Sequence, residues 1–322
     1  MSPLVSIIIP TYNAAPYIEK CLRSLVAQDY SNIEIIVVDD ESTDGSADIA
    51  EALHLDKVKV LRLPHGGVSR ARNAGIREAS GKYIIFIDGD DWVEPDHLST
   101  MLVPAESGID CVVTRIQFDN EDGTPQFAEE LCGYGQPDQR LEHKDFNVLF
   151  DAHQMGSPCD KLYRRDIIVE NNILFDDKIT YAEDFVFNLN YFACIKTLLR
   201  IHKPTYHYVK HTSSSSFRYH HNAAYIATEI CKAASRAITK TTLQGKLIYQ
   251  KHFVWAIINL FHKDCPLNKR EKIDELRKIF RNPDFKKSQD AIRLLEVGRM
   301  LKVFLRLRAP RLLYYAFSLK KK

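Results

Sequence analysis

Short runs of β-branched residues alternate with helical stretches over the first hundred residues of the chain. The run Val5–Ile9 is apolar at nearly every position, which is typical of a strand buried on both faces of a parallel sheet. The same pattern predicts strands at 33–38, 57–63 and 83–87, with helices between the strands at 16–26, 44–53 and 68–79. This alternation predicts right-handed crossovers and an α/β fold with a doubly wound, mostly parallel sheet.

Beyond residue 110 the pattern is mixed. It predicts a strand at 111–118, a polar loop or hairpin at 119–137, a helix at 183–195, and a pair of strands at 197–202 and 205–209. After residue 222 the pattern is helical to the end, with breaks near Pro266, Pro283 and Pro310. We therefore expect an α/β domain over residues 1–215 and a helical region over residues 216–322.

Three of the predicted strands run directly into polar residues. The first is followed by Pro10-Thr11-Tyr12-Asn13, the second by Asp39-Asp40-Glu41-Ser42 and the fourth by Asp88-Gly89-Asp90-Asp91. Ligands of doubly wound sheets bind beyond the carboxyl ends of the strands. We therefore expect these three polar segments to form one rim.

The composition is that of an ordinary soluble globular protein: 45% hydrophobic residues, 27% charged residues and a net charge of +2 over 322 residues. The seven cysteines are scattered singly, which predicts reduced thiols rather than a disulfide framework. The N-terminus has no signal-peptide pattern, and no run of 18 apolar residues occurs. We therefore expect a cytoplasmic protein, working in solution or at the cytoplasmic face of the membrane.

The acidic run Asp88-Gly89-Asp90-Asp91 places three carboxylates at one predicted strand end. Three like charges this close repel one another, and a hard divalent cation with oxygen ligands would offset the repulsion. Such a cation would bridge the two phosphates of a nucleotide donor and neutralise charge on the departing diphosphate. The alternative interpretation is an acidic helix start, with Asp90 or Asp91 capping a helix near Pro95.

The other two polar segments also suit a nucleotide. Asp39 ends a buried strand, where a carboxylate commonly meets a ribose hydroxyl or a base N–H. No G-x-G-x-x-G turn follows the first strand, which counts against an NAD or FAD site. Gly66 and Gly67 open a predicted helix that carries Arg70 and Arg72, an arrangement that suits a diphosphate, although a solvated surface helix is the alternative.

Four motifs together closely resemble the family 2 glycosyltransferases of GT-A fold. They agree with that family in order and spacing over residues 4–100: Ser6-Ile7-Ile8-Ile9-Pro10-Thr11-Tyr12-Asn13, Asp39-Asp40-x-Ser42-x-Asp44-Gly45, Ala71-Arg72-Asn73-x-Gly75 and Asp88-x-Asp90-Asp91. The resemblance implies an inverting transfer of a hexose or N-acetylhexosamine from a nucleotide sugar, usually UDP-linked, with Mn²⁺ or Mg²⁺.

The resemblance also implies roles for individual residues. By position, the donor nucleoside would contact Pro10, Thr11, Tyr12 and Asp39. Arg72 would lie beside donor groups, Asp88 would contact the ribose or the metal, and Asp90 would be the principal metal ligand.

Two later segments resemble further parts of the family's site. Glu183-Asp184 looks like the acidic base motif, in which Asp184 would deprotonate the acceptor hydroxyl and Glu183 would support it. A pair of acids interacting with a helix dipole is the alternative. His211 and Lys210 stand where a basic loop closes over the diphosphate in similar enzymes, and a solvated loop is the alternative there.

The C-terminal segment 299–322 contains eight Lys or Arg and no acidic residue, interleaved with apolar residues. A basic amphipathic helix suits an anionic membrane surface, and the acceptor in this family is often a lipid-linked glycan. Packing of the apolar side on the core, with the charges solvated, is the alternative. No nucleic-acid-binding motif accompanies these charges, so nucleic acid is not expected as a partner.

We therefore expect an enzyme that transfers a sugar to a glycan or lipid-linked glycan acceptor in the synthesis of a cell-surface polysaccharide or an exopolysaccharide. A nucleotidyltransferase that makes sugar nucleotides is a rival, but it should carry a glycine-rich, basic N-terminal signature, which the stretch around Pro10 lacks. A catalytically inactive glycan-binding relative is a third possibility, and the intact acidic clusters argue against it.

Overall fold

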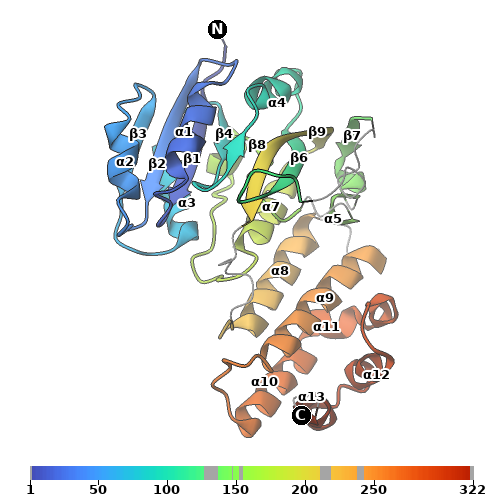
Figure 1. Cartoon of the computed structure of the whole chain (residues 1–322). Coiled ribbons are helices and arrows are strands. Elements are labelled where there is room, and N and C mark those ends of the chain that lie inside the picture. Colours follow the sequence, from blue (N-terminus) through green and yellow to red (C-terminus); the bar gives the residue numbers. More distant parts are fainter. Residues whose placement is uncertain are drawn as a thin grey trace. The chain divides into compact units, whose positions relative to one another are not determined.

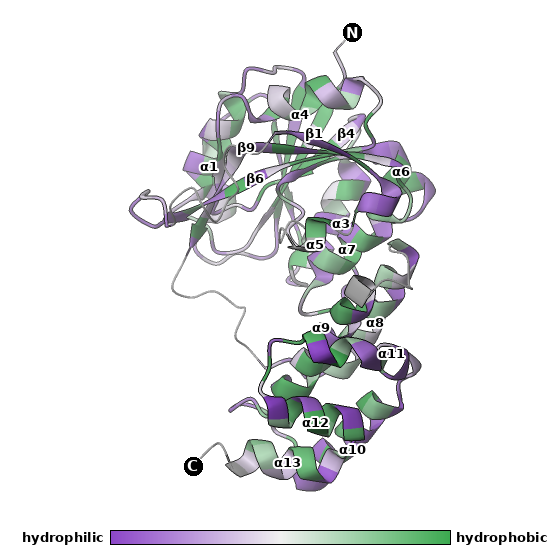
Figure 2. Ribbon diagram, turned by 90° about the vertical axis from the view of Figure 1, so that its right-hand side faces the viewer, coloured by the Kyte–Doolittle hydropathy of each residue, from purple (hydrophilic) through white to green (hydrophobic). Residues whose placement is uncertain are grey.

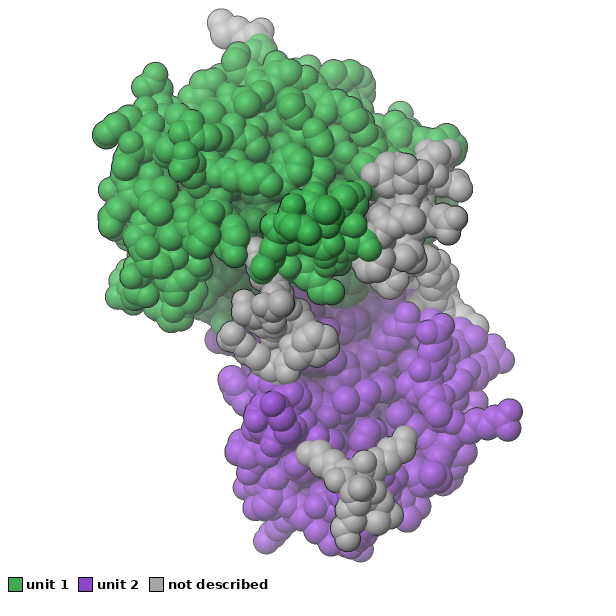
Figure 3. All heavy atoms as spheres, viewed as in Figure 1, with its two compact units in different colours: residues 1–177, 183–214 green, residues 178–182, 215–322 purple. Residues whose placement is uncertain are grey.

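The computed structural model describes residues 2–126, 137–146, 148–151, 155–210, 219–237 and 243–319. The chain forms two compact units, residues 1–177 with 183–214 and residues 178–182 with 215–322 (Figure 3). The short segment 178–182 belongs to the second unit because Tyr181 stacks on Trp255, with ring centroids 4.3 Å apart. The first unit contains the sheet, and the second is helical.

The described part of the first unit contains a nine-stranded sheet (Figure 1). One half of the sheet is parallel, as predicted, and follows the order β3-β2-β1-β4. Its strands are β1 (Val5–Thr11), β2 (Ile33–Asp39), β3 (Val58–Arg62) and β4 (Tyr83–Phe86). β1 and β4 are buried along their whole length, which explains their continuous apolar runs.

The other half of the sheet is mixed. It consists of β5 (Trp92–Val93), β6 (Cys111–Asn120), β7 (Gln139–Glu142), β8 (Lys161–Arg164) and β9 (Thr197–Lys210). β8 pairs antiparallel with both β4 and β6, and β9 pairs parallel with β6. The predicted pair of strands at 197–209 is wrong, because β9 is one continuous strand. Pro204 lacks an N–H, but register shifts beside Arg115 in β6 absorb the irregularity.

Helices cover both faces of this sheet (Figure 2). α1 (Ile18–Val26) and α4 (His97–Glu106) lie on one face, and α3 (Val68–Glu78) and α7 (Glu183–Phe192) lie on the other. The remaining helices of the unit are α2 (Ser46–Ala52), α5 (Val148–Asp151), α6 (Arg165–Glu170) and a short 3-10 helix, His143–Asp145. Gly75 lets α3 approach β1 closely, because a Cβ there would lie 2.3 Å from Cγ2 of Ile8.

Two asparagines fix α3 and α7 to other segments of the same chain. The Asn73 side chain donates to the carbonyl of Phe175 (2.8 Å) and accepts from its N–H (2.9 Å). Asn188 is fully buried, and its amide nitrogen donates to the carbonyls of residues 155–157 at 2.8–3.1 Å. Its oxygen accepts from the Tyr163 hydroxyl. These bonds hold the two helices that carry Arg72 and Asp184 in place.

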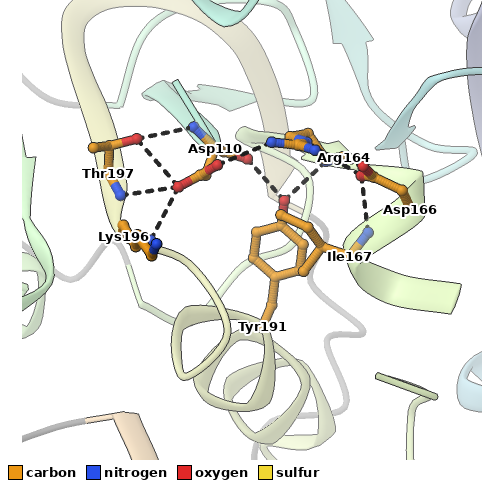
Figure 4. Close-up of polar contacts among 7 residues, drawn as sticks. All are labelled: Asp110, Arg164, Asp166, Ile167, Tyr191, Lys196 and Thr197. Atoms are coloured by element: carbon orange, nitrogen blue, oxygen red, sulfur yellow. Dashed lines mark hydrogen bonds and ion pairs between the residues drawn. The ribbon is translucent and has the colours of Figure 1, made fainter. Parts of the chain in front are cut away.

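A polar network at the start of β6 joins four elements (Figure 4). The Asp110 carboxylate accepts from the N–H groups of Lys196 (3.0 Å) and Thr197 (3.1 Å) and pairs with Arg164 (3.1 Å). The Tyr191 hydroxyl donates to the Asp110 carbonyl and accepts from the Arg164 N–H, each at 2.8 Å. The network fixes α7 against β6, β8 and β9 at the edge where these strands begin or end.

The second unit is built from helices. They are α8 (Ala223–Ala237), α9 (Leu243–Asn259), α10 (Lys269–Arg281), α11 (Pro283–Lys287), a 3-10 helix (Gln289–Leu294), α12 (Arg299–Leu307) and α13 (Pro310–Leu319). The predicted breaks are confirmed, because α11 and α13 begin at the predicted prolines and Pro266 lies between α9 and α10. None of the helices formed by the described residues combines the length and the apolar character that a membrane span requires.

The basic C-terminal segment forms two helices rather than one. Arg308 adopts a left-handed conformation (φ 48°), and the chain turns there between α12 and α13. Leu305 and Leu313 are fully buried, so one side of each helix packs within the unit. Large apolar side chains on other positions stay exposed.

Candidate active site

The three polar segments lie at one edge of the parallel half-sheet. Thr11 and Asp39 are partners in the β1–β2 register, and the Asp40 N–H donates to the Thr11 carbonyl at 2.9 Å. The N–H of Ile87, next to Asp88, donates to Ile8 of β1 at 3.0 Å. β4 therefore delivers Asp88 to the edge where β1 and β2 end.

Arg72 connects this edge to α7. Its guanidinium is buried, with 4% of the side chain exposed, and its Nη2 donates to Oδ1 of Asp88 at 2.9 Å. Its Nη1 donates to Oδ1 of Asp184, which lies 112 residues further along the chain. One planar cation thus places an acid from the end of β4 and an acid from the first turn of α7 within a single site.

Phe175 forms one wall around Arg72, whose guanidinium lies 5.2 Å from the centre of that ring. Burial opposes the charged form of Arg72, but the carboxylates of Asp184 and Asp88 outweigh it and hold the pKa of the guanidinium well above its ordinary value. Arg72 is therefore a permanent cation at this site.

Asp184 has the properties expected of a base. Its side chain keeps 26% of its surface exposed, so it is accessible from solvent. Burial raises its pKa to about 7, against the opposing effect of Arg72 and with smaller contributions from Glu183 and Asp88. Glu183 precedes it in the first turn of α7 and is half-buried. Burial raises the pKa of Asp184 and Arg72 lowers it, and the balance of the two effects places this pKa near neutral pH.

The three acids of the β4 cluster have different environments. Asp91 is buried and turns inward, where it accepts from the Val209 N–H (2.8 Å) and the Tyr206 hydroxyl. Burial, with the charges of Asp88 and Asp90, raises the pKa of Asp91 well above its ordinary value. The alternative that Asp90 or Asp91 caps a helix near Pro95 is wrong, because α4 begins at His97 with Asp96 at its N-cap, and Asp91 bonds to β9 instead.

Asp88 and Asp90 are the half-buried members of this cluster. Within the ranges that the structure describes, no three His, Cys, Asp or Glu side chains converge well enough to hold a metal by themselves. Mg²⁺ typically binds one or two carboxylates and completes its coordination with substrate phosphates and water. The donor set of Asp88 and Asp90 fits that kind of shared site, in which the nucleotide supplies the missing ligands.

Asp39 and Asp40 also differ. Both Asp40 carboxylate oxygens are occupied, one by the Gly66 N–H and one by the Gly67 N–H, each at 2.8 Å. Asp40 therefore organises the turn before α3. Asp39 is equally buried, and its Oδ2 accepts from the Ser42 N–H at 3.2 Å, but its Oδ1 has no hydrogen-bond partner among the described residues. A buried carboxylate oxygen without a donor in the protein is available to water or to a ligand.

An exposed aromatic pair stands next to Asp39. The Tyr12 side chain is 53% exposed, and its ring centroid lies 4.8 Å from that of His65. His65 Nδ1 lies 2.9 Å from the Asp40 carboxylate. Thr11 is buried, and its hydroxyl donates to the Ile9 carbonyl at 3.4 Å, while Pro10 is buried within β1. Gly89 keeps this edge open, because a Cβ there would lie 3.2 Å from Oγ1 of Thr11.

The structure thus brings Arg72, Asp88 and Asp184 into direct contact and sets Thr11 beside Asp39. His211 lies outside the described residues, so its place in the site stays a prediction. Sequence reasoning missed His65, Phe175 and Tyr206, which support Asp40, Arg72 and Asp91. Their contacts join segments far apart in the chain, so no local spacing indicates them.

Residues 6–170, just over half of the chain, match the profile of the family described as glycosyl transferase family 2. This chain belongs to that family. The family predicted from the motifs is therefore confirmed.

Two bacterial relatives illustrate the similarity. EpsH of Bacillus subtilis (strain 168) is 37% identical over 224 residues, which cover 68% of this chain and 64% of EpsH. Glycosyltransferase GlyG of Streptococcus pneumoniae serotype 4 is 32% identical over 193 residues, which cover 56% of this chain and 64% of GlyG. The chain therefore spans slightly less than two thirds of the length of each.

Solved structures show the same fold. Residues 1–349 of Staphylococcus aureus TarS, in complex with UDP-GlcNAc, superpose with a TM-score of 0.72 at 22% sequence identity. The match covers 97% of this chain and 90% of that one. The predicted α/β architecture of GT-A type with a helical C-terminal region is confirmed by this likeness.

Proposed function

We propose that this chain is an inverting glycosyltransferase that moves a hexose or N-acetylhexosamine from a UDP-sugar to a glycan acceptor. The observation that carries the proposal is the Asp88–Arg72–Asp184 bridge, which joins the acidic edge of the sheet to a half-buried acid poised near neutral pH. Family membership supports it, as does TarS, which is named poly(ribitol-phosphate) beta-N-acetylglucosaminyltransferase. We assign the transfer to residues 1–215.

The donor nucleoside would lie at the ends of β1 and β2. The unpartnered Oδ1 of Asp39 suits a ribose hydroxyl or a base N–H, and the exposed ring of Tyr12 offers a stacking surface. The diphosphate would extend toward Asp88 and Asp90 at the end of β4. Asp90, together with Asp88, would hold Mn²⁺ or Mg²⁺, which when bound neutralises charge on the departing diphosphate.

Asp184 would act as the base. In its deprotonated form the carboxylate takes the proton of the acceptor hydroxyl as that oxygen attacks the anomeric carbon. The bond between the anomeric carbon and the diphosphate breaks as the new glycosidic bond forms on the opposite face of that carbon. The configuration at the anomeric carbon is therefore inverted. Arg72 holds Asp184 in place, and the negative charge of Glu183 raises the pKa of Asp184.

A thermal-shift screen of UDP-, GDP- and dTDP-sugars with Mn²⁺ tests the donor, and a transfer assay with the best donor tests the activity. We expect UDP-sugars to stabilise the protein most. The proposal would be refuted if no nucleotide sugar stabilised the protein and neither transfer nor donor hydrolysis was detected.

Asp90→Ala is expected to abolish metal-dependent donor binding. Loss of a main metal ligand should lower kcat/KM by about 100-fold or more, because charge on the leaving diphosphate is no longer neutralised. The melting temperature without ligands should stay close to wild type, since Asp90 is half-buried at the open edge of the sheet. Stabilisation by UDP should then lose its dependence on Mn²⁺, and an unchanged Mn²⁺ dependence would remove Asp90 from the metal site.

Asp39→Asn is expected to weaken UDP binding by about 10- to 100-fold, because hydrogen bonds to a charged acceptor are worth about 1.5–3 kcal/mol. Isothermal titration of UDP measures the change. Asp56→Asn, an exposed acid that precedes β3, is the matched control and should bind UDP as wild type does. Equal affinity in Asp39→Asn and wild type would contradict the role of the orphan oxygen.

The acceptor side of the proposal involves a membrane. We propose that the acceptor is a glycan or lipid-linked glycan used for a cell-surface polysaccharide or an exopolysaccharide, and that the protein works at the cytoplasmic membrane face. The exposed apolar and basic side chains of residues 299–319 support contact with an anionic surface.

A further inference from the structure

The helical unit carries an open depression between α10 and α13, with a volume of about 670 Å³. Four cations line it: Lys269, Arg270 and Arg277 from α10, and Arg311 from α13. Ile273 contributes an apolar surface, and none of the lining residues is acidic. Such a set of guanidinium and ammonium groups suits a phosphate.

Acids on α10 offset only part of this positive charge. Glu271 accepts from the Asn268 N–H in the capping box that starts α10, at 2.7 Å. Asp274 pairs with Arg277 at 2.6 Å, one turn further along. Among the described residues, neither Arg270 nor Arg311 has an ion-pair partner within 4.0 Å. The depression therefore keeps a net positive charge, to which the N-terminus of α10 adds.

Lys269 is fixed in position by two tyrosines. Its Nζ donates to the Tyr315 hydroxyl at 2.6 Å and lies 4.6 Å from the centre of the Tyr315 ring and 5.8 Å from that of Tyr314. The hydrogen bond and charge of Lys269, with a smaller effect of Arg311, lower the pKa of Tyr315. The cations of the depression thus favour the negatively charged form of a group that lies among them, the Tyr315 hydroxyl.

Exposed apolar side chains occur on α12 and α13, and α13 contacts both α12 and α10. On α12, Met300, Val303 and Leu307 are 64%, 50% and 64% exposed. Their spacing places them on one face of the helix, and Figure 2 shows hydrophilic and hydrophobic positions mixed along it. On α13, Leu312 follows Arg311 and is 52% exposed. Basic and apolar groups on the same short helices are typical of segments that lie in a membrane interface.

We propose that the α10–α13 depression binds the phosphate of an anionic phospholipid while the apolar face of α12 enters the interface. A free phosphate would satisfy the cations but would leave the apolar stripe Met300, Val303 and Leu307 in water. A lipid headgroup satisfies both, because its phosphate and its acyl region are joined in one molecule. This inference depends on the membrane contact proposed above and assigns it a specific headgroup site.

The test uses the full chain and vesicles of phosphatidylcholine with or without phosphatidylglycerol. Wild type should co-sediment with the anionic vesicles and not with the neutral ones. The pair Arg270→Gln with Arg311→Gln should weaken that partition about tenfold or more, since each basic residue near the surface contributes a several-fold gain. The matched pair Lys286→Gln with Lys287→Gln removes the same charge from exposed positions on α11, outside the depression, and should change it less than threefold.

A third variant separates the site from the membrane contact as a whole. Met300→Ser with Val303→Ser and Leu307→Ser should reduce vesicle binding while leaving the cations intact. Equal losses in the arginine pair and the lysine pair would show diffuse charge only and would overturn the headgroup site. Loss in the serine variant alone would overturn the site but not the membrane contact. Failure of wild type to bind vesicles, or thermal stabilisation by soluble glycerol phosphate without vesicle binding, would overturn the lipid assignment.

Discussion

Asp184→Asn should lower kcat by about 10²- to 10⁴-fold, the usual contribution of a general base. The asparagine side chain keeps the shape of the carboxylate and can still accept from Arg72, so the fold should be retained, but it cannot take a proton at neutral pH. Donor binding should change little, because Asp184 lies on α7 and the proposed nucleoside contacts lie on β1 and β2. Single-turnover transfer, together with UDP titration, separates the two effects.

The pH dependence provides an independent check on the same residue. Only the deprotonated carboxylate can act as the base, and burial raises the pKa of Asp184 to about 7. The kcat of wild type should therefore rise with pH through about 7 and level off above it. Glu183→Gln removes a negative charge that raises this pKa, so its acid limb should move to lower pH. A residual kcat within tenfold of wild type in Asp184→Asn would assign the base to another group.

Arg72→Gln should destabilise the protein by about 3–5 kcal/mol, the usual cost of removing one partner from a buried ion pair. Glutamine cannot bridge Asp88 and Asp184 as a cation, so two carboxylates are left facing each other without a counter-charge. The pKa of Asp184 should rise further, and activity at neutral pH should fall because less of the base is deprotonated. Urea denaturation measures the stability, and a pH–rate profile measures the shift.

Arg70→Gln is the matched control for this variant. Arg70 lies on the same helix but is exposed, so its loss should change the free energy of unfolding by about 0.5 kcal/mol or less. In an Asp184→Asn background the cost of Arg72→Gln should shrink, because fewer carboxylates are left uncompensated. A cost that is the same in both backgrounds would show that Arg72 contributes through packing on Phe175 rather than through the bridge.

Local sequence was enough to predict the parallel half of the sheet. Continuous apolar runs specify strands buried on both faces, and the polar residues after Ile9, Val38 and Ile87 had to fall at one edge because parallel strands end on the same side. The motif Ala71-Arg72-Asn73-x-Gly75 was visible as a helix. The contacts that explain these residue types were not visible in the sequence. Gly75 packs on Ile8 and Asn73 is hydrogen-bonded to Phe175, and each of these partners lies on another element.

The site itself was predictable as a set of residue types but not as a set of contacts. The sequence placed three acids at 88–91, and the family resemblance gave metal roles to Asp88 and Asp90 alone. The structure supplies the physical reason for the difference, because pairing of β5 with β9 buries Asp91 under Tyr206 and leaves Asp88 and Asp90 at the edge. Likewise Asp39 and Asp40 look alike in sequence. Their difference arises because the turn before α3 supplies two N–H groups to Asp40 and none to Oδ1 of Asp39.

By itself, the sequence determined the parallel strands and the connecting helices over residues 5–87, the family to which the chain belongs, and the presence of acids and an arginine near the strand ends. Those properties follow from short-range periodicity and from motifs of fixed spacing. Only the tertiary structure decided that Arg72 holds Asp88 and Asp184 together, that β9 is one strand, and which apolar residues of the basic C-terminal segment are buried. The physical reason is that these outcomes depend on partners up to 112 residues apart, which chain topology brings together and local pattern does not encode.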